Sequence, residues 1–193
     1  YATLLDLFEE LRYTPEAGYG TDYGDATGLL VGTLPFADVT PTILYYDQRG
    51  RMIQKKSVTP LGMDQEYYRY TFSGKVEKKK LAHHVSGGND ICELYTYTYD
   101  HSDRLLKTRY KINSDPEIAM NEFTYDELGR IKTKKQFNYT PIDYSYNIRG
   151  WLTYIGYNSF VQHLYYEEPF QSDLGVRNTE YYNGSVSTMF YSF

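Results

Sequence analysis

Residues 125–131 read Tyr-Asp-Glu-Leu-Gly-Arg-Ile, and variants of this phrase recur along the 193-residue chain. The shared pattern is Tyr, then Asp or Asn, two variable residues, Gly, Arg and an apolar residue, as in residues 46–52. Residues 99–105 and 146–152 are further copies, and residues 70–76 and 182–186 are shortened ones. The leading tyrosines at 46, 70, 99, 125 and 146 are 24, 29, 26 and 21 residues apart. This spacing suits one β-hairpin plus its return connection, so the sequence predicts a repeat protein.

The phrase has the chemistry of a tight hairpin turn. Asp followed three residues later by Gly is typical of a type I turn closed by a residue in the left-handed conformation. Asp126 can accept a hydrogen bond from the backbone two residues on, and Gly129 can take a positive φ without steric cost. Asp103 replaces that Gly in one copy, and Asp also tolerates this conformation. The predicted turn residues are Tyr46, Asp47, Gly50, Arg51, Tyr99, Asp100, Arg104, Tyr125, Asp126, Gly129, Arg130, Tyr146, Asn147, Gly150 and Trp151.

The turn also predicts which residues face each other across the hairpin. If Asp126 lies opposite Arg130, counting outward in steps of one residue gives the rest of the register. The predicted facing pairs are Tyr125 with Ile131, Phe123 with Thr133, Thr124 with Lys132, Tyr99 with Leu105, and Tyr146 with Leu152. Ion pairs are expected at the tips, at Asp47–Arg51, Asp100–Arg104 and Asp126–Arg130, each contributing only about 0.2–1 kcal/mol.

The amino-acid composition also favours β-strands over helices. The 24 tyrosines favour β-structure, and a mean hydropathy of −0.61 beside 18% aromatic residues means that amphipathic rings carry the apolar surface. The predicted fold is all-β, with consecutive antiparallel hairpins in a twisted, curved or spiral open sheet. Residues 1–40 are expected to form an irregular or helical lead-in, in which Leu4, Leu5, Leu7, Phe8 and Leu11 make one face of a short helix. Residues 41–193 are expected to hold the repeats and to form one domain with the lead-in.

Several function classes find no support in the sequence. The net charge of −5 lacks the basic excess of a nucleic-acid-binding protein, and no window approaches the roughly 20 apolar residues of a membrane span. A lone cysteine, Cys92, excludes an internal disulfide framework. The four histidines have no metal-ligand spacing, so no metal, cofactor or catalytic residue is predicted.

Trp151 occupies the position that Arg holds in other copies, and it has two interpretations. It can pack over a neighbouring hairpin, or it can form a sugar-stacking platform with Tyr154 and Tyr157. A carbohydrate-binding or adhesion module that uses exposed Tyr and Trp rows is therefore the alternative to a structural role. A third hypothesis is a hydrolase whose carboxylates come from separate strands, which requires converging acids with raised pKa values.

The repeated phrase, together with residues 142–153, Ile-Asp-Tyr-Ser-Tyr-Asn-Ile-Arg-Gly-Trp-Leu-Thr, resembles the YD repeat of RHS proteins of the Bacteroidetes type. The likeness covers roughly residues 27–193. It implies a non-catalytic segment of a large secreted or cell-surface bacterial protein, outer-membrane associated, whose hairpins wind into a spiral sheet. In relatives such as insecticidal toxin-complex components and teneurins, that sheet closes into a hollow shell, and bacterial members often carry a C-terminal toxin.

The resemblance also implies partners, namely neighbouring repeats or a toxin domain of the parent protein, and carbohydrate for some YD-repeat regions. Edge-to-edge self-association is expected of an open sheet. Two features depart from the family pattern. The segment is too short for a full shell, and Asp115-Pro116 is followed by Glu117 where toxin-bearing relatives have the Gly of their self-processing site.

Overall fold

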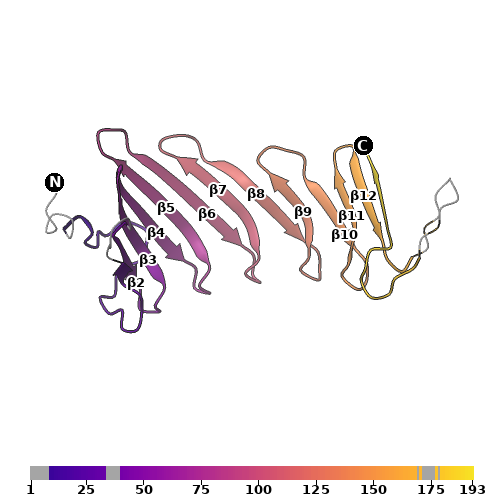
Figure 1. The fold of residues 1–193 in the computed structure, drawn as a ribbon, viewed down its shortest axis with the longest axis horizontal. Coiled ribbons are helices and arrows are strands. Elements are labelled where there is room, and N and C mark those ends of the chain that lie inside the picture. Colours follow the sequence, from indigo (N-terminus) through magenta and orange to yellow (C-terminus); the bar gives the residue numbers. More distant parts are fainter. Residues whose placement is uncertain (1–8, 34–39, 169, 171–176, 178) are drawn as a thin grey trace. The chain divides into compact units, whose positions relative to one another are not determined.

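The computed structural model describes residues 9–33, 40–168, 170, 177 and 179–193 (Figure 1). These residues contain thirteen β-strands, and every described strand pair is antiparallel, which confirms the all-β prediction. Among them no helix has the length and apolar character needed to cross a membrane. The chain forms two compact units, residues 1–118 and 119–193.

In the first unit each strand pairs with the next one along the chain. The strands are β1 (Gly32–Thr33), β2 (Thr42–Tyr46), β3 (Met52–Thr59), β4 (Gly62–Tyr70), β5 (Val76–Val85), β6 (Ile91–Tyr99) and β7 (Leu105–Ile112). Successive hairpins therefore build a meander, as the repeat predicted.

The second unit has the same organisation. Its strands are β8 (Ile118–Tyr125), which starts at the last residue of the first unit, β9 (Ile131–Gln136), β10 (Ile142–Tyr146), β11 (Leu152–Tyr157), β12 (Phe160–Tyr165) and β13 (Thr188–Ser192). β12 ends at Tyr165 and β13 begins at Thr188, and the Tyr181 N–H donates to the Tyr166 carbonyl at 2.9 Å.

The register next to each turn is the predicted one, but further along the strands it is not. Tyr125 faces Ile131, and the pairs Tyr99–Leu105 and Tyr146–Leu152 are also confirmed. Thr124, however, faces Thr133 instead of Lys132, and Phe123 faces Lys134 instead of Thr133. These two predictions are wrong because Lys132 is an extra residue in the second strand, a β-bulge that regular alternation does not anticipate.

The same bulge occurs in five hairpins. In each, the second residue of the second strand has no partner of its own, and the extra residues are Ile53, Glu77, Leu106, Lys132 and Thr153. A bulge bends the strand and increases its right-handed twist. Additional twist is therefore built into each of these five copies at a fixed distance from its turn.

Part of the lead-in lies across one face of the first unit. We call residues 9–23 the strap. Of the predicted N-terminal helix, Leu4, Leu5, Leu7 and Phe8 lie outside the described residues, and helical backbone is described only at residues 9 and 10. Leu11 is fully buried, as are Ile53, Gln54 and Lys56 of β3 below it. The core of this unit therefore sits between the strap and the sheet.

Candidate functional site

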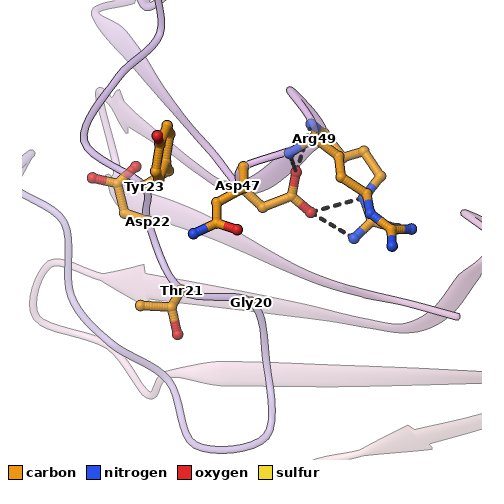
Figure 2. Close-up of a pocket in the computed structure, with 8 residues that line it drawn as sticks. Gly20, Thr21, Asp22, Tyr23, Asp47 and Arg49 are labelled. Carbon is orange, nitrogen blue, oxygen red and sulfur yellow. Dashed lines mark hydrogen bonds and ion pairs between the residues drawn. The ribbon is translucent and has the colours of Figure 1, made fainter. Parts of the chain in front are cut away.

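In the three phrases that carry an Asp, this residue organises the turn through three hydrogen bonds. Figure 2 shows Asp47, whose Oδ1 accepts the Arg49 and Arg51 N–H groups at 2.9 and 3.0 Å and whose Oδ2 accepts Arg51 Nε at 2.7 Å. Equivalent bonds surround Asp100 and Asp126, and Asn147 makes the two backbone bonds. The predicted tip ion pairs are thus present, each with its closest contact at 2.6 Å.

Backbone conformation at the turns follows the residue types. Gly50, Gly129 and Gly150 have φ values of 69°, 82° and 82°, and Asp103, which replaces Gly in its copy, has a φ of 59°. Burial opposes ionisation of Asp47, but the hydrogen bonds from Arg51 and Arg49 outweigh it and lower the pKa of the carboxyl. The Asp side chain is therefore held as an anion by its own turn.

The leading Tyr of a copy binds the copy before it. Its hydroxyl donates to the backbone carbonyl of the apolar residue that ends the preceding phrase. The bonds are Tyr70 to Met52 at 2.6 Å, Tyr99 to Val76 at 2.8 Å and Tyr146 to Ile131 at 3.0 Å. Tyr166, which follows β12 and leads no copy of the phrase, makes the same bond to Leu152 at 2.8 Å. Sequence reasoning missed this role. The available signal was that every copy begins with Tyr and none with Phe, although Phe would pack equally well.

The Arg of a phrase connects its own turn to the next copy. The Arg51 guanidinium lies 4.7 Å from the centre of the Tyr70 ring, and its Nη1 donates to the Thr71 carbonyl at 3.3 Å. Arg130 does the same in the second unit, with 4.7 Å to the Tyr146 ring and 3.1 Å to the Asn147 carbonyl. We call this arrangement, the Asp–Arg pair of one copy with the Tyr of the next, the repeat junction.

Trp151 occupies the Arg position of a repeat junction. Its ring centre lies 5.1 Å from that of Tyr166, whose hydroxyl donates to the Leu152 carbonyl, and its indole packs 3.3 Å from the position that a Cβ would take on Gly184. Tyr154 packs against His163 at 5.2 Å. Tyr154 and Tyr157 are three positions apart in β11 and so project to opposite faces, which prevents one shared platform. Ligand stacking on Trp151, Tyr154 or Tyr157 stays a prediction.

Glu66 is the centre of a charged cluster on the first unit. It accepts Lys55 Nζ at 2.9 Å, lies 3.1 Å from Lys79 Nζ, and accepts the Tyr68 hydroxyl at 2.5 Å. Burial opposes its ionisation, but these partners outweigh burial and lower the pKa of Glu66 to about 2. The cluster joins β3, β4 and β5 through one carboxylate.

We expect Glu66→Gln to lower the free energy of unfolding by about 1–2 kcal/mol at neutral pH. Because the folded-state pKa is depressed, this contribution is present above the ordinary carboxyl pKa and declines as the pH falls toward 2. Urea unfolding of wild type and variant at several pH values between about 7 and about 3 measures it. Glu127→Gln, at an exposed turn position, is the control. A loss for Glu66→Gln that is the same at every pH would contradict the assignment.

The carboxyl groups give no support to the hydrolase hypothesis. Among the described residues, each carboxyl with a resolved shift has a lowered pKa, at Asp25, Asp47, Glu66, Asp100 and Asp126. A catalytic acid of the expected kind needs a raised pKa. Within the same described ranges no group of three His, Cys, Asp or Glu residues could hold a metal ion.

The strap holds the sheet face through polar contacts to its backbone. Gln54 binds the backbone of Thr14 twice, with its Oε1 accepting the Thr14 N–H at 3.3 Å and its Nε2 donating to the Thr14 carbonyl at 3.0 Å. Lys56 Nζ donates to the Glu10 carbonyl at 3.0 Å. A pocket of about 390 Å³ lies between strap residues 20–23 and the turn at Asp47 and Arg49 (Figure 2).

Comparisons with known proteins find resemblance only at the level of structure. No family model matches the chain, and no curated protein does. A crystal structure of TcdB2-TccC3-TEV superposes with a TM-score of 0.35 and 14% sequence identity over 81% of this chain. A crystal structure of TcdB2-TccC3-Cdc42 gives 0.33 and 13% over the same share. The aligned part is 9% of each of those chains.

Proposed function

We propose that the chain is a non-catalytic structural segment, a stretch of β-sheet wall, in a larger RHS-like protein that encloses a toxin domain. The observation that carries the proposal is the repeat junction. The Tyr, Asp and Arg that define the phrase bind one another and the neighbouring copy. Side chains used in this way hold a sheet together and are not displayed to a substrate.

The junction also makes the sheet extensible. The Tyr hydroxyl of a copy donates to the backbone of the preceding copy, and its Arg donates to the backbone of the following one. Any number of copies can therefore be joined by the same contacts. The bulge repeated in every such hairpin adds twist in the same sense, as a curved wall requires. These two properties support a wall, with the toxin-enclosing role and the secreted or cell-surface location drawn from the resemblance of the phrase to RHS repeats.

The size and location of the natural protein test the proposal. An antibody raised against this chain should detect, in fractionated source cells, a band far above 22.6 kDa at the cell surface or in the medium. Mass spectrometry of that band should then identify an additional domain in the same polypeptide. A protein of about 22.6 kDa confined to the cytosol would refute the wall function.

Removing one junction hydrogen bond should destabilise the sheet measurably. We expect Tyr70→Phe, which deletes the donor to the Met52 carbonyl, to lower the free energy of unfolding by about 1–2 kcal/mol. Tyr139→Phe is the matched control, since Tyr139 is exposed and its described hydrogen bond uses the backbone, and we expect less than about 0.5 kcal/mol. Urea unfolding measures both. Equal stabilities for the two variants would contradict the junction.

A further inference from the structure

One row of residues crosses the first unit from strand to strand on a single face. Each member is the register partner of the next, so the side chains stand side by side. From β2 to β7 the row is Tyr45, Gln54, Tyr67, Lys80, Leu94 and Lys111. The strap lies on the part of the row from Tyr45 to Lys80, and Leu94 and Lys111 continue the row beyond it.

The strap shows what this face binds. The Tyr45 hydroxyl donates to the Leu11 carbonyl at 2.8 Å, and Gln54 binds both backbone groups of Thr14. The strap then places Glu16 at 2.7 Å from Lys80 Nζ. The face therefore holds a polypeptide segment by its backbone and anchors an acidic side chain on a lysine.

A pocket of about 370 Å³ opens alongside the strap. Strap residues 16–19 form one side of it, and Lys78, Lys80, Leu94 and Lys111 lie on the sheet side. Lys78 and Lys80 are two positions apart in β5 and so share a face. Leu94 stands between Lys80 and Lys111, which gives the pocket an apolar floor flanked by ammonium groups.

The charge of this pocket is only partly neutralised. Glu16 pairs with Lys80, and the nearby arginines are paired elsewhere, Arg69 with Glu77 at 2.9 Å and Arg109 with Glu117 at 3.2 Å. Lys78 and Lys111 have no ion-pair partner among the residues that the structure describes. Two positive charges thus remain beside a lysine that already holds a carboxylate.

We propose that this pocket is a binding site for an acidic polypeptide segment, which lies beside the strap and repeats its mode of attachment. Carboxylates of the segment contact Lys78 and Lys111, and an apolar side chain packs on Leu94. Charge complementarity identifies the partner as acidic, and continuity with the strap identifies it as polypeptide. The inference does not depend on the wall function, because it concerns one face of the first unit and is tested on the isolated chain.

Fluorescence anisotropy with a short fluorescein-labelled oligoglutamate tests the site. We expect saturable binding to the chain and an affinity about tenfold weaker for the double variant Lys78→Gln/Lys111→Gln, as the loss of two partly exposed ion pairs requires. The matched control is Lys75→Gln/Lys132→Gln, which removes the same charge at two exposed positions. That variant should bind within about twofold of wild type. Circular dichroism of both variants checks that they fold.

Three outcomes would overturn the proposal. The first is no saturable binding by the wild-type chain. The second is an equal loss in both double variants, which would assign the binding to net charge. The third is binding of oligodeoxythymidylate as tightly as oligoglutamate with the same loss on Lys78→Gln/Lys111→Gln, which would assign the site to nucleic acid.

Discussion

Replacing Gly62 with Ala is expected to lower the free energy of unfolding by about 3 kcal/mol or more, the largest loss among the variants considered. Gly62 begins β4 with a φ of 146°, and it pairs with Val85 of β5. A Cβ at this position would lie 1.8 Å from the His84 carbonyl oxygen and 2.9 Å from the His84 carbonyl carbon. Both are backbone atoms of a paired strand, so β4 and β5 must separate locally to admit the methyl group.

Gly74→Ala isolates the steric part of this effect. Gly74 also has a positive φ, 93°, but a Cβ there would meet no atom within 4 Å. Only backbone strain remains, and we expect a loss of about 1 kcal/mol. Urea unfolding of the two variants provides the comparison. If Gly62→Ala costs no more than Gly74→Ala, β4 and β5 do not approach each other as described.

Replacing Lys56 with Met is expected to stabilise the protein by about 1–2 kcal/mol at neutral pH. Lys56 is 1% exposed, and its ammonium has the Glu10 carbonyl as its described hydrogen-bond partner. An ammonium without a carboxylate is costly to bury, whereas Met has a similar length and no charge. The variant loses one hydrogen bond but removes the larger cost of desolvating the charge.

The pH dependence of this gain has a definite sign. Burial lowers the pKa of Lys56, so the unfolded chain binds more protons than the folded one at pH values between the depressed and the ordinary pKa. Wild-type stability therefore rises with pH through this range, and the advantage of Lys56→Met shrinks. Unfolding at about pH 7 and about pH 10 measures the change. A destabilised Lys56→Met would show that the Glu10 contact outweighs the burial of the amine.

The turns could be predicted from the sequence because their causes are local. Asp126 and Gly129 lie within one phrase, and their hydrogen bond and φ follow from residue type alone. The pair next to each turn, such as Tyr125 with Ile131, follows from the turn. The bulge at Lys132 could not be predicted, because no residue type marks it and period-two counting assumes that it is absent.

Long-range contacts explain what the sequence did not reveal of the candidate site. The Tyr146 hydroxyl bonds to a carbonyl 15 residues away, and Lys56 binds a strap residue 46 positions away. Nothing near Gln54 or Lys56 indicates that they lie under a strap, since both look like solvent-facing strand residues. Trp151 holds the position that Arg130 has in its own phrase, and its contact with Tyr166 agrees with one of the two interpretations that the sequence left open.

The two ends of a hairpin differ in how much variation in connection length they accept. At the end that carries the phrase, five residues separate the strands in each of the first five copies, at 47–51, 71–75, 100–104, 126–130 and 147–151. At the opposite end the connections have two residues at 60–61 and 158–159 but five at 86–90 and 137–141. The phrase end is therefore constant in length, and the unequal steps between leading tyrosines arise from the lengths of the strands and of the opposite connections. Insertions, whether they arise in evolution or are engineered to graft a foreign epitope, can lengthen these opposite connections while the phrase turns keep their length.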